Sequence, residues 1–202
     1  MKIAIVLSLV GAALVGVASQ ASAQTVLYTD GPINGSINAF ELNYGCSYGT
    51  SFTLGSEAVV NEVNIGTWTN PGDTLQSLNW AITSSLGGSV IASGNSAISS
   101  YTFHNSFAGY DINSVDFSVT PTDLAAGTYY LQLSGAVTAQ DHVCYWDENN
   151  GSASSGLLSG NDGNTAGALS LTILNGAPVP EPTTLALAGL GLTSLAFLRR
   201  RK

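Results

Sequence analysis

The sequence predicts an all-β protein whose body folds as a two-sheet antiparallel β-sandwich, jelly-roll-like in type. Short runs rich in Val, Ile, Thr and aromatic residues recur between clusters of Gly, Asn, Ser, Asp and Pro, as strands and turns do. Residues 112–120 alternate, with Val115, Phe117 and Val119 on one face and small polar residues on the other. No apolar period of 3.6 residues persists in the body, which argues against a long helix there.

The expected strands follow one another along the body, and each is bounded by turn-forming residues. In chain order they are residues 25–29, 37–42, 50–54, 59–68, 77–82, 89–93, 97–103, 112–120, 127–137, 142–146 and 168–174. The turns NPGD at 70–73 and LGGS at 86–89 separate neighbouring strands. TDLAAG at 122–127 predicts a single helical turn. Ten or eleven strands of this length are typical of a sandwich.

The first 23 residues have the pattern of a secretory signal peptide. Lys2 is followed by an uninterrupted apolar run at residues 3–17, and small residues then lead to Ala21 and Ala23. A charged start, an apolar centre and an A-x-A ending are the features that signal peptidase recognises. We expect cleavage after Ala23 and a new amino terminus at Gln24. The alternative is an uncleaved anchor.

The charge distribution of the body is one-sided. All five Lys and Arg lie at residue 2 and at 199–202, whereas all thirteen Asp and Glu lie between Asp30 and Glu181. Nucleic acid is excluded as an expected partner, because phosphate binding requires cationic side chains. The chain is 45% hydrophobic and 9% charged, which favours a folded body over a disordered one. Residues 24–175 suffice for one domain with its own core.

The carboxyl end has three consecutive parts. Residues 176–182 predict an extended linker, because prolines fix φ and remove N–H donors. Residues 183–198 are an uncharged apolar run, predicted as a transmembrane helix of about 24 Å, near the lower limit for a membrane span. Four cations follow it and predict a basic cytoplasmic stop: Arg199, Arg200, Arg201 and Lys202. The body would then lie outside the inner membrane.

These three parts together resemble the PEP-CTERM sorting signal of exported proteins in Gram-negative bacteria. The motif residues are Val179, Pro180, Glu181 and Pro182. The resemblance covers only about the last two dozen residues. It implies recognition by an exosortase, a membrane-embedded cysteine protease thought to act near the motif, and an association with exopolysaccharide and biofilm matrix. It also implies an address in the cell envelope, at the cell surface or outside the cell, with a transient or permanent membrane anchor.

Cys46 and Cys144 are the two cysteines of the chain. Export would place them in an oxidising compartment, where disulfides persist. We therefore predict a disulfide between them. The alternative is a pair of buried thiols.

The best candidate ligand-binding residues lie around one short loop. Tyr145 and Trp146 precede an oxygen-rich loop, and exposed aromatic rings can stack on sugars. Four carboxylates near or beyond that loop are candidate calcium ligands, because Ca²⁺ prefers oxygen: Asp141, Asp147, Glu148 and Asp162. The alternative interpretation is that Trp146 belongs to the core and that the loop is a solvated turn.

No motif predicts catalysis. Residues 45–49 match G-x-S-x-G around Ser47, but a strand rather than a helix is expected after them, so no nucleophile elbow is predicted. We expect an exported, non-catalytic protein of the cell surface or extracellular matrix, with no required cofactor. The alternative is a carbohydrate-binding module, with or without calcium. A glycoside hydrolase, which needs two facing carboxylates, is a distant third.

Overall fold

The computed structural model describes residues 24–160 and 167–175, which lie within one compact unit, Gln24–Gly176. The predicted signal peptide, Asp162, the sorting motif and the apolar run at 183–198 lie outside the described residues. The described residues form eleven strands, which are β1 (Thr25–Thr29), β2 (Ala39–Glu41), β3 (Ser47–Leu54), β4 (Ala58–Thr69), β5 (Leu75–Thr83), β6 (Val90–Phe107), β7 (Tyr110–Leu124), β8 (Gly127–Thr138), β9 (Cys144–Asp147), β10 (Ser155–Ser159) and β11 (Leu171–Asn175).

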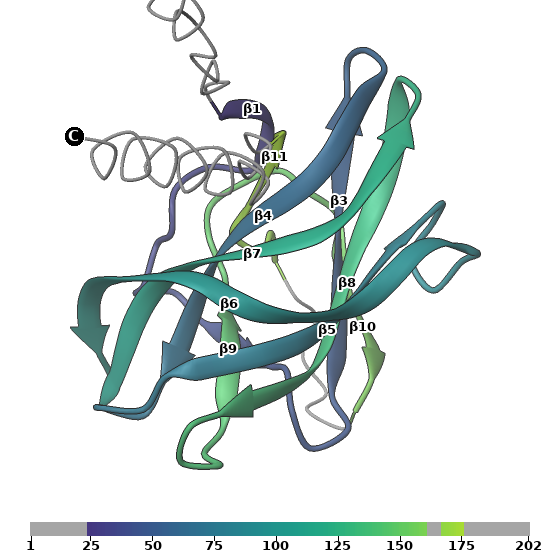
Figure 1. Cartoon of the computed structure of the whole chain (residues 1–202). Helices are drawn as coiled ribbons and strands as arrows, with labels where there is room; N and C mark the ends of the chain where they lie inside the picture. Colours follow the sequence, from purple (N-terminus) through teal and green to yellow (C-terminus); the bar gives the residue numbers. More distant parts are fainter. Residues whose placement is uncertain (1–23, 161–166, 176–202) are drawn as a thin grey trace, which may run out of the picture. The chain divides into compact units, whose positions relative to one another are not determined.

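The strands form one curled antiparallel sheet (Figure 1). Its order is β1-β11-β4-β7-β6-β5-β8-β3-β10, and β9 pairs with both β4 and β2 beside this path. The sheet curls so that its first strand approaches β3, near the other end of the strand order. The rings of Tyr28 in β1 and Phe52 in β3 lie 6.3 Å apart. The all-β class is thus confirmed, whereas the finer prediction of two separate sheets is not.

β6 is the reason why the sheet is continuous. Its first half pairs with β5, as at Ala97 opposite Ser77. Its second half pairs with β7, as at Ile98 opposite Phe117. One strand of 18 residues therefore serves both halves of the curl, where the sequence predicted two shorter strands. Its residues are exposed or half-buried throughout, and the half-buried Ala92, Ile98 and Tyr101 pack against the core.

The core lies inside the curl, between the β1-β11-β4-β7 half and the β5-β8-β3 half. Val115, Phe117 and Val119 are buried, as the alternation of β7 predicts. Leu131 and Leu133 of β8 are buried from the other half. All three Trp residues are at most 5% exposed. The fully buried side chains with the largest volume are Trp146, Tyr48, Phe40, Phe52 and Phe117.

Long-range pairing explains two differences between the structure and the sequence prediction. Residues 122–124 continue β7 instead of forming a helical turn, because Leu124 pairs with Ala58 of β4. The register shifts between Val60 and Glu62, opposite Pro121, so the residue without an N–H lies at a bulge. β10 was not predicted at all; it forms because residues 155–159 pair with β3.

Among the described residues, no helix is long and apolar enough to cross a membrane. The predicted span at 183–198 is not among them.

Candidate functional site

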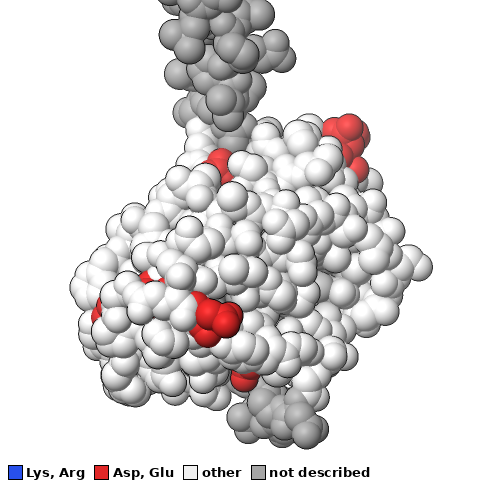
Figure 2. Space-filling view, turned by 60° about the horizontal axis from the view of Figure 1, so that its bottom comes forward, with Lys and Arg blue, Asp and Glu red and all other residues white. Residues whose placement is uncertain are grey.

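The body holds carboxylates without Lys or Arg to pair with them. Figure 2 shows acidic side chains scattered over the visible face and no basic ones among the described residues. Three of the carboxylates are nevertheless buried: Asp30, Asp73 and Asp147. Burying a charge is unfavourable unless hydrogen bonds replace the lost water. Each buried carboxylate must therefore obtain its donors from backbone N–H groups, neutral side chains or a histidine.

Asp147, at the end of β9, holds the segment that follows β1. Its Oδ1 accepts hydrogen bonds from Trp68 Nε1 at 2.7 Å and from the Gly35 N–H at 2.9 Å. Its Oδ2 accepts the Asn34 N–H at 2.9 Å. Burial raises the pKa of this carboxyl above its ordinary value, against the opposing effect of these bonds. Close packing at β4 is possible because residue 66 is glycine; an added Cβ would lie 2.8 Å from the Asp147 Cβ.

Asp30, just after β1, holds the segment that follows β9. Its Oδ1 accepts the Ser152 N–H at 2.9 Å and the Ala153 N–H at 3.1 Å. The hydroxyl of Tyr28 also donates to Oδ1, at 3.3 Å. Burial, with the nearby Asp30 charge, raises the pKa of Tyr28 to about 12. Asp30 and Asp147 thus act reciprocally. Asp147 in β9 fixes the segment after β1, and Asp30 after β1 fixes the segment after β9.

The predicted oxygen-rich loop lies where the segments after β1 and after β9 meet. With residues 29–32 and Asn34, it lines an open pocket of about 390 Å³. Asn149 is buried there, and its Nδ2 donates to the carbonyl of Asp30 at 3.0 Å. Its Oδ1 accepts the Gly151 N–H at 2.9 Å. The Asp30 carbonyl and Asn149 Oδ1 are therefore engaged in fixing the loop itself.

The two predicted glycan contacts lie on opposite faces of β9. Trp146 is fully buried and donates from Nε1 to the carbonyl of Ser170 at 2.8 Å, so its ring offers no face to a sugar. This agrees with the alternative that placed Trp146 in the core. Tyr145 is half-buried on the outer face, edge-on to Tyr110 with centroids 5.4 Å apart. The two side chains cannot form one stacking platform, because successive residues of a strand point to opposite faces.

The candidate calcium ligands do not converge either. Asp141 is exposed in the loop before β9, whereas Asp147 is buried and engaged by three donors. Glu148 is half-buried, and Asp162 lies outside the described residues. In the described part of the chain, no three His, Cys, Asp or Glu side chains are grouped to hold a metal ion.

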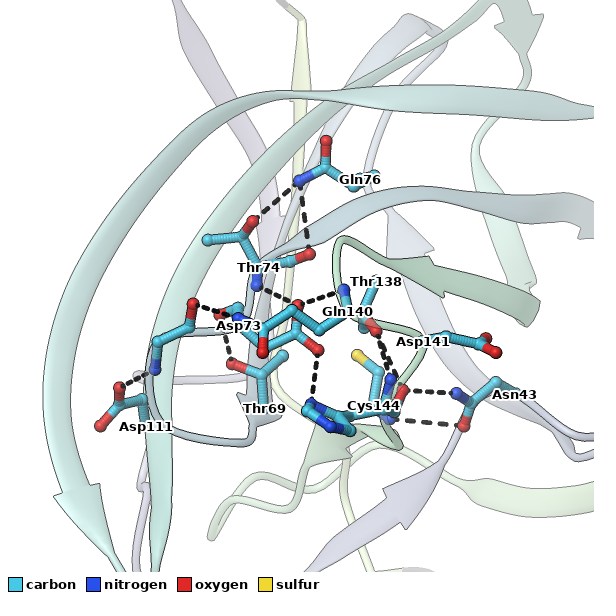
Figure 3. A network of polar contacts seen from close by, with 12 residues as sticks. Asn43, Thr69, Asp73, Thr74, Gln76, Asp111, Thr138, Gln140, Asp141 and Cys144 are labelled. Carbon is cyan, nitrogen blue, oxygen red and sulfur yellow. Dashed lines mark hydrogen bonds and ion pairs between the residues drawn. The ribbon is translucent and has the colours of Figure 1, made fainter.

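Asp73, in the predicted NPGD turn, is the centre of a second network (Figure 3). Its Oδ1 accepts the Thr74 N–H at 2.8 Å and the Gln140 N–H at 3.0 Å. Its Oδ2 lies 3.2 Å from His142 Nδ1, close enough for an ion pair but not aligned as a hydrogen bond. Burial opposes ionisation, but the hydrogen bonds and His142 outweigh it and lower the pKa of the Asp73 carboxyl. This network ties the β4–β5 turn to the β8–β9 loop.

Both cysteines are buried next to this network, without a disulfide bond between them. Asn43 contacts both backbones: its carbonyl accepts the Cys46 N–H at 2.9 Å, and its Oδ1 accepts the Cys144 N–H at 3.3 Å. Burial, and then the charge of Asp73, raise the pKa of Cys144 to about 12. A thiol with a pKa raised in this way is protonated at neutral pH and is a weak nucleophile. The predicted disulfide stays a prediction.

Asp30 and Asp73 were missed as structural centres by sequence reasoning. The absence of Lys and Arg indicates only that any buried acid of the body must be satisfied by backbone N–H groups, neutral side chains or a histidine. Which acids are buried depends on the fold, so the sequence did not single out Asp30 and Asp73.

We predict that Asp147→Ala lowers the free energy of unfolding by about 3 kcal/mol, because Trp68 Nε1 and two backbone N–H groups lose their acceptor. Asp147→Asn should cost less, since one oxygen remains. Urea unfolding followed by tryptophan fluorescence measures both. The exposed Asp123→Ala should change stability by less than about 0.5 kcal/mol. Equal effects for the two alanine variants would contradict this role of Asp147.

The Asp73 network should make stability depend on acid pH. A carboxyl whose folded-state pKa is lowered stabilises the fold fully above its unfolded pKa of about 3.9, and this contribution disappears as pH falls through the folded value. Asp73→Asn should therefore lower the melting temperature at pH 6, and the difference from wild type should shrink below about pH 4. Thermal unfolding from pH 7 to pH 2 measures it, with Asp123→Asn as control. A difference that stays constant to pH 2 would refute the prediction.

The comparison with known proteins gives a match at the carboxyl end of the chain, outside the described residues. A family model described as the PEP-CTERM protein-sorting motif matches residues 178–202. No curated protein matches the chain. The match includes the four motif residues, the apolar run and the four terminal cations identified in the sequence. The chain therefore carries a PEP-CTERM sorting motif and is a PEP-CTERM domain-containing protein.

Proposed function

We propose that this protein is a non-catalytic component of the cell surface or extracellular matrix, associated with exopolysaccharide and biofilm. The observation that carries the proposal is the sorting motif at residues 178–202, which implies export to the cell envelope or surface and processing by exosortase. The strongly acidic body fits such an address, because a high net charge keeps an exported protein soluble. Signal peptidase would remove residues 1–23, and the apolar run would hold the chain in the membrane until processing.

The use of the buried acids supports a non-catalytic body. Glycoside hydrolysis needs two carboxyl groups on either side of a cleft, one of them able to donate a proton. Asp30, Asp73 and Asp147 each accept at least two backbone N–H bonds that fix loops. A carboxylate engaged in this way is poorly placed to approach a substrate. The glycoside hydrolase alternative has no such supporting observation.

The sorting proposal is tested by the intact mass of the protein, recovered separately from the envelope and the culture medium of its host. We expect a species that begins at Gln24 and ends near Pro182, much lighter than the 20.7 kDa full chain. Replacing Pro180, Glu181 and Pro182 together by Ala should abolish this species. A chain that still ends at Lys202 in every fraction would indicate a permanent anchor and would refute release into the matrix.

The same measurement tests the disulfide proposed between Cys46 and Cys144. In an oxidising compartment, buried cysteines can be joined once export is complete. Reduction should then add the mass of two hydrogens. An unchanged mass means two thiols.

Calcium belongs to the glycan-binding alternative and has its own test. A calcium ion bound only by the folded state stabilises it by mass action. If calcium supports the loop after β9, EDTA should lower the melting temperature and added CaCl₂ should restore it, with MgCl₂ as the control. A melting temperature that is unchanged by EDTA would eliminate structural calcium.

A further inference from the structure

A polar groove crosses the outer face of the β3-β8-β5-β6 part of the sheet. It has a volume of about 530 Å³ and is open to solvent along its length. Its lining includes Ser47, Asn79, Ser93, Gln132 and Ser134. None of these residues belongs to the carboxylate networks that hold the loops.

The register of the strands arranges the outward side chains in two adjacent rows. In the first row, Ser47 of β3 lies opposite Ser134 of β8, which lies opposite Asn79 of β5. Paired residues of an antiparallel sheet share a face and lie about 5 Å apart, so these three side chains form a continuous polar line. Asn95 of β6 extends it, donating from Nδ2 to Asn79 Oδ1 at 3.0 Å.

The second row of outward residues consists mostly of small residues, which leaves the space of the groove. Gln132 of β8 has Gly49 of β3 on one side and Ala81 of β5 on the other, and Ser93 of β6 follows. Gln132 is thus the one long side chain of this row, between small neighbours. Its Nε2 donates to Thr83 Oγ1 at 2.9 Å, which fixes the direction of the amide.

A loop and the neighbouring strand supply the wall at one end of the groove. Leu86, in the β5–β6 loop, packs over Gly49 and Gly156, where an added Cβ would lie 2.7 Å from its methyl groups. Leu158 of β10 packs similarly against Gly87. The wall is held in place because these glycines leave room for leucine side chains, so the groove exists without a ligand to form it.

The chemistry of the lining selects the class of ligand. The groove is lined by hydroxyls, amides, small residues and the apolar Trp80, Leu133 and Leu158, with no charged side chain among its described lining residues. Hydroxyls and amides both donate and accept hydrogen bonds, which matches the hydroxyl groups of a sugar. The acidic body repels polyanions, since residues 24–182 have no Lys or Arg to offset the acids. An open groove also admits a polymer without requiring a chain end.

We propose that this groove binds an uncharged glycan chain, with Asn79, Gln132 and Ser134 as the hydrogen-bonding contacts. The inference rests on the proposed role in the extracellular matrix and names the ligand class. It places binding on the β3-β8-β5-β6 face rather than at Tyr145 and Trp146.

The test is affinity electrophoresis of the protein recovered from its host, in native gels that contain one soluble polysaccharide each. Dextran, mannan and laminarin serve as neutral probes and alginate as the anionic control. We expect retardation by at least one neutral probe and none by alginate. Asn79→Ala and Gln132→Ala should each weaken binding about fivefold, the effect of one lost hydrogen bond. Gln76→Ala, exposed on the same strand as Asn79 but outside the groove, should bind as wild type.

A blocking variant provides independent support. Ser93 is exposed on β6, so Ser93→Phe should fill the groove without disturbing the core, and its melting temperature should match that of wild type. Loss of retardation by this variant supports the proposal. Retardation by no neutral probe, retardation unchanged in all groove variants, or a loss only in Tyr145→Ala would overturn it. The mass measurement of the sorting proposal is independent of these results, so a correctly processed protein that binds no glycan refutes only this inference.

Discussion

The structure depends on one constraint: acidic groups are buried in a body that contains no Lys or Arg. Ion pairs with these residues are excluded, so backbone N–H groups take their place. A backbone donor is attached to its loop, and the hydrogen bond that satisfies the carboxylate therefore also fixes the loop. Asp147 and Asp30 do this reciprocally, joining the segments after β1 and after β9. Asp73 does the same between the β4–β5 turn and the β8–β9 loop, with His142 at its exposed side.

The curl of the sheet explains why these loops come together. β6 pairs with β5 at one end and with β7 at the other, so this single strand connects the two halves of the sheet that enclose the core. β9 pairs with β4 beyond the end of β11, and this pairing places Asp147 next to the Trp68 indole. The same pairing sends Trp146 into the core. Residues that looked like a ligand-binding loop in the sequence are thereby used for stability.

The hydrogen bonds of the buried acids fix the loops around β9, and the proposed binding surface lies on another face of the sheet. The loops around β9 are engaged by hydrogen bonds, whereas the face of β3, β8, β5 and β6 carries polar side chains without charges. The sorting motif supplies the address, and the groove offers a surface suited to a matrix polymer.

Features that depend only on neighbouring residues could be predicted from the sequence. The alternation in β7 predicted its buried face, because a strand has a period of two whatever its neighbours are. The sorting motif could also be identified from the sequence, because it is a short continuous segment. The continuity of β6, the existence of β10 and the exchange of hydrogen bonds between the segments of Asp30 and Asp147 depend on long-range contacts. Each depends on segments far apart in the chain, such as Ala153 and Asp30, and no local pattern encodes which distant N–H a carboxylate will meet.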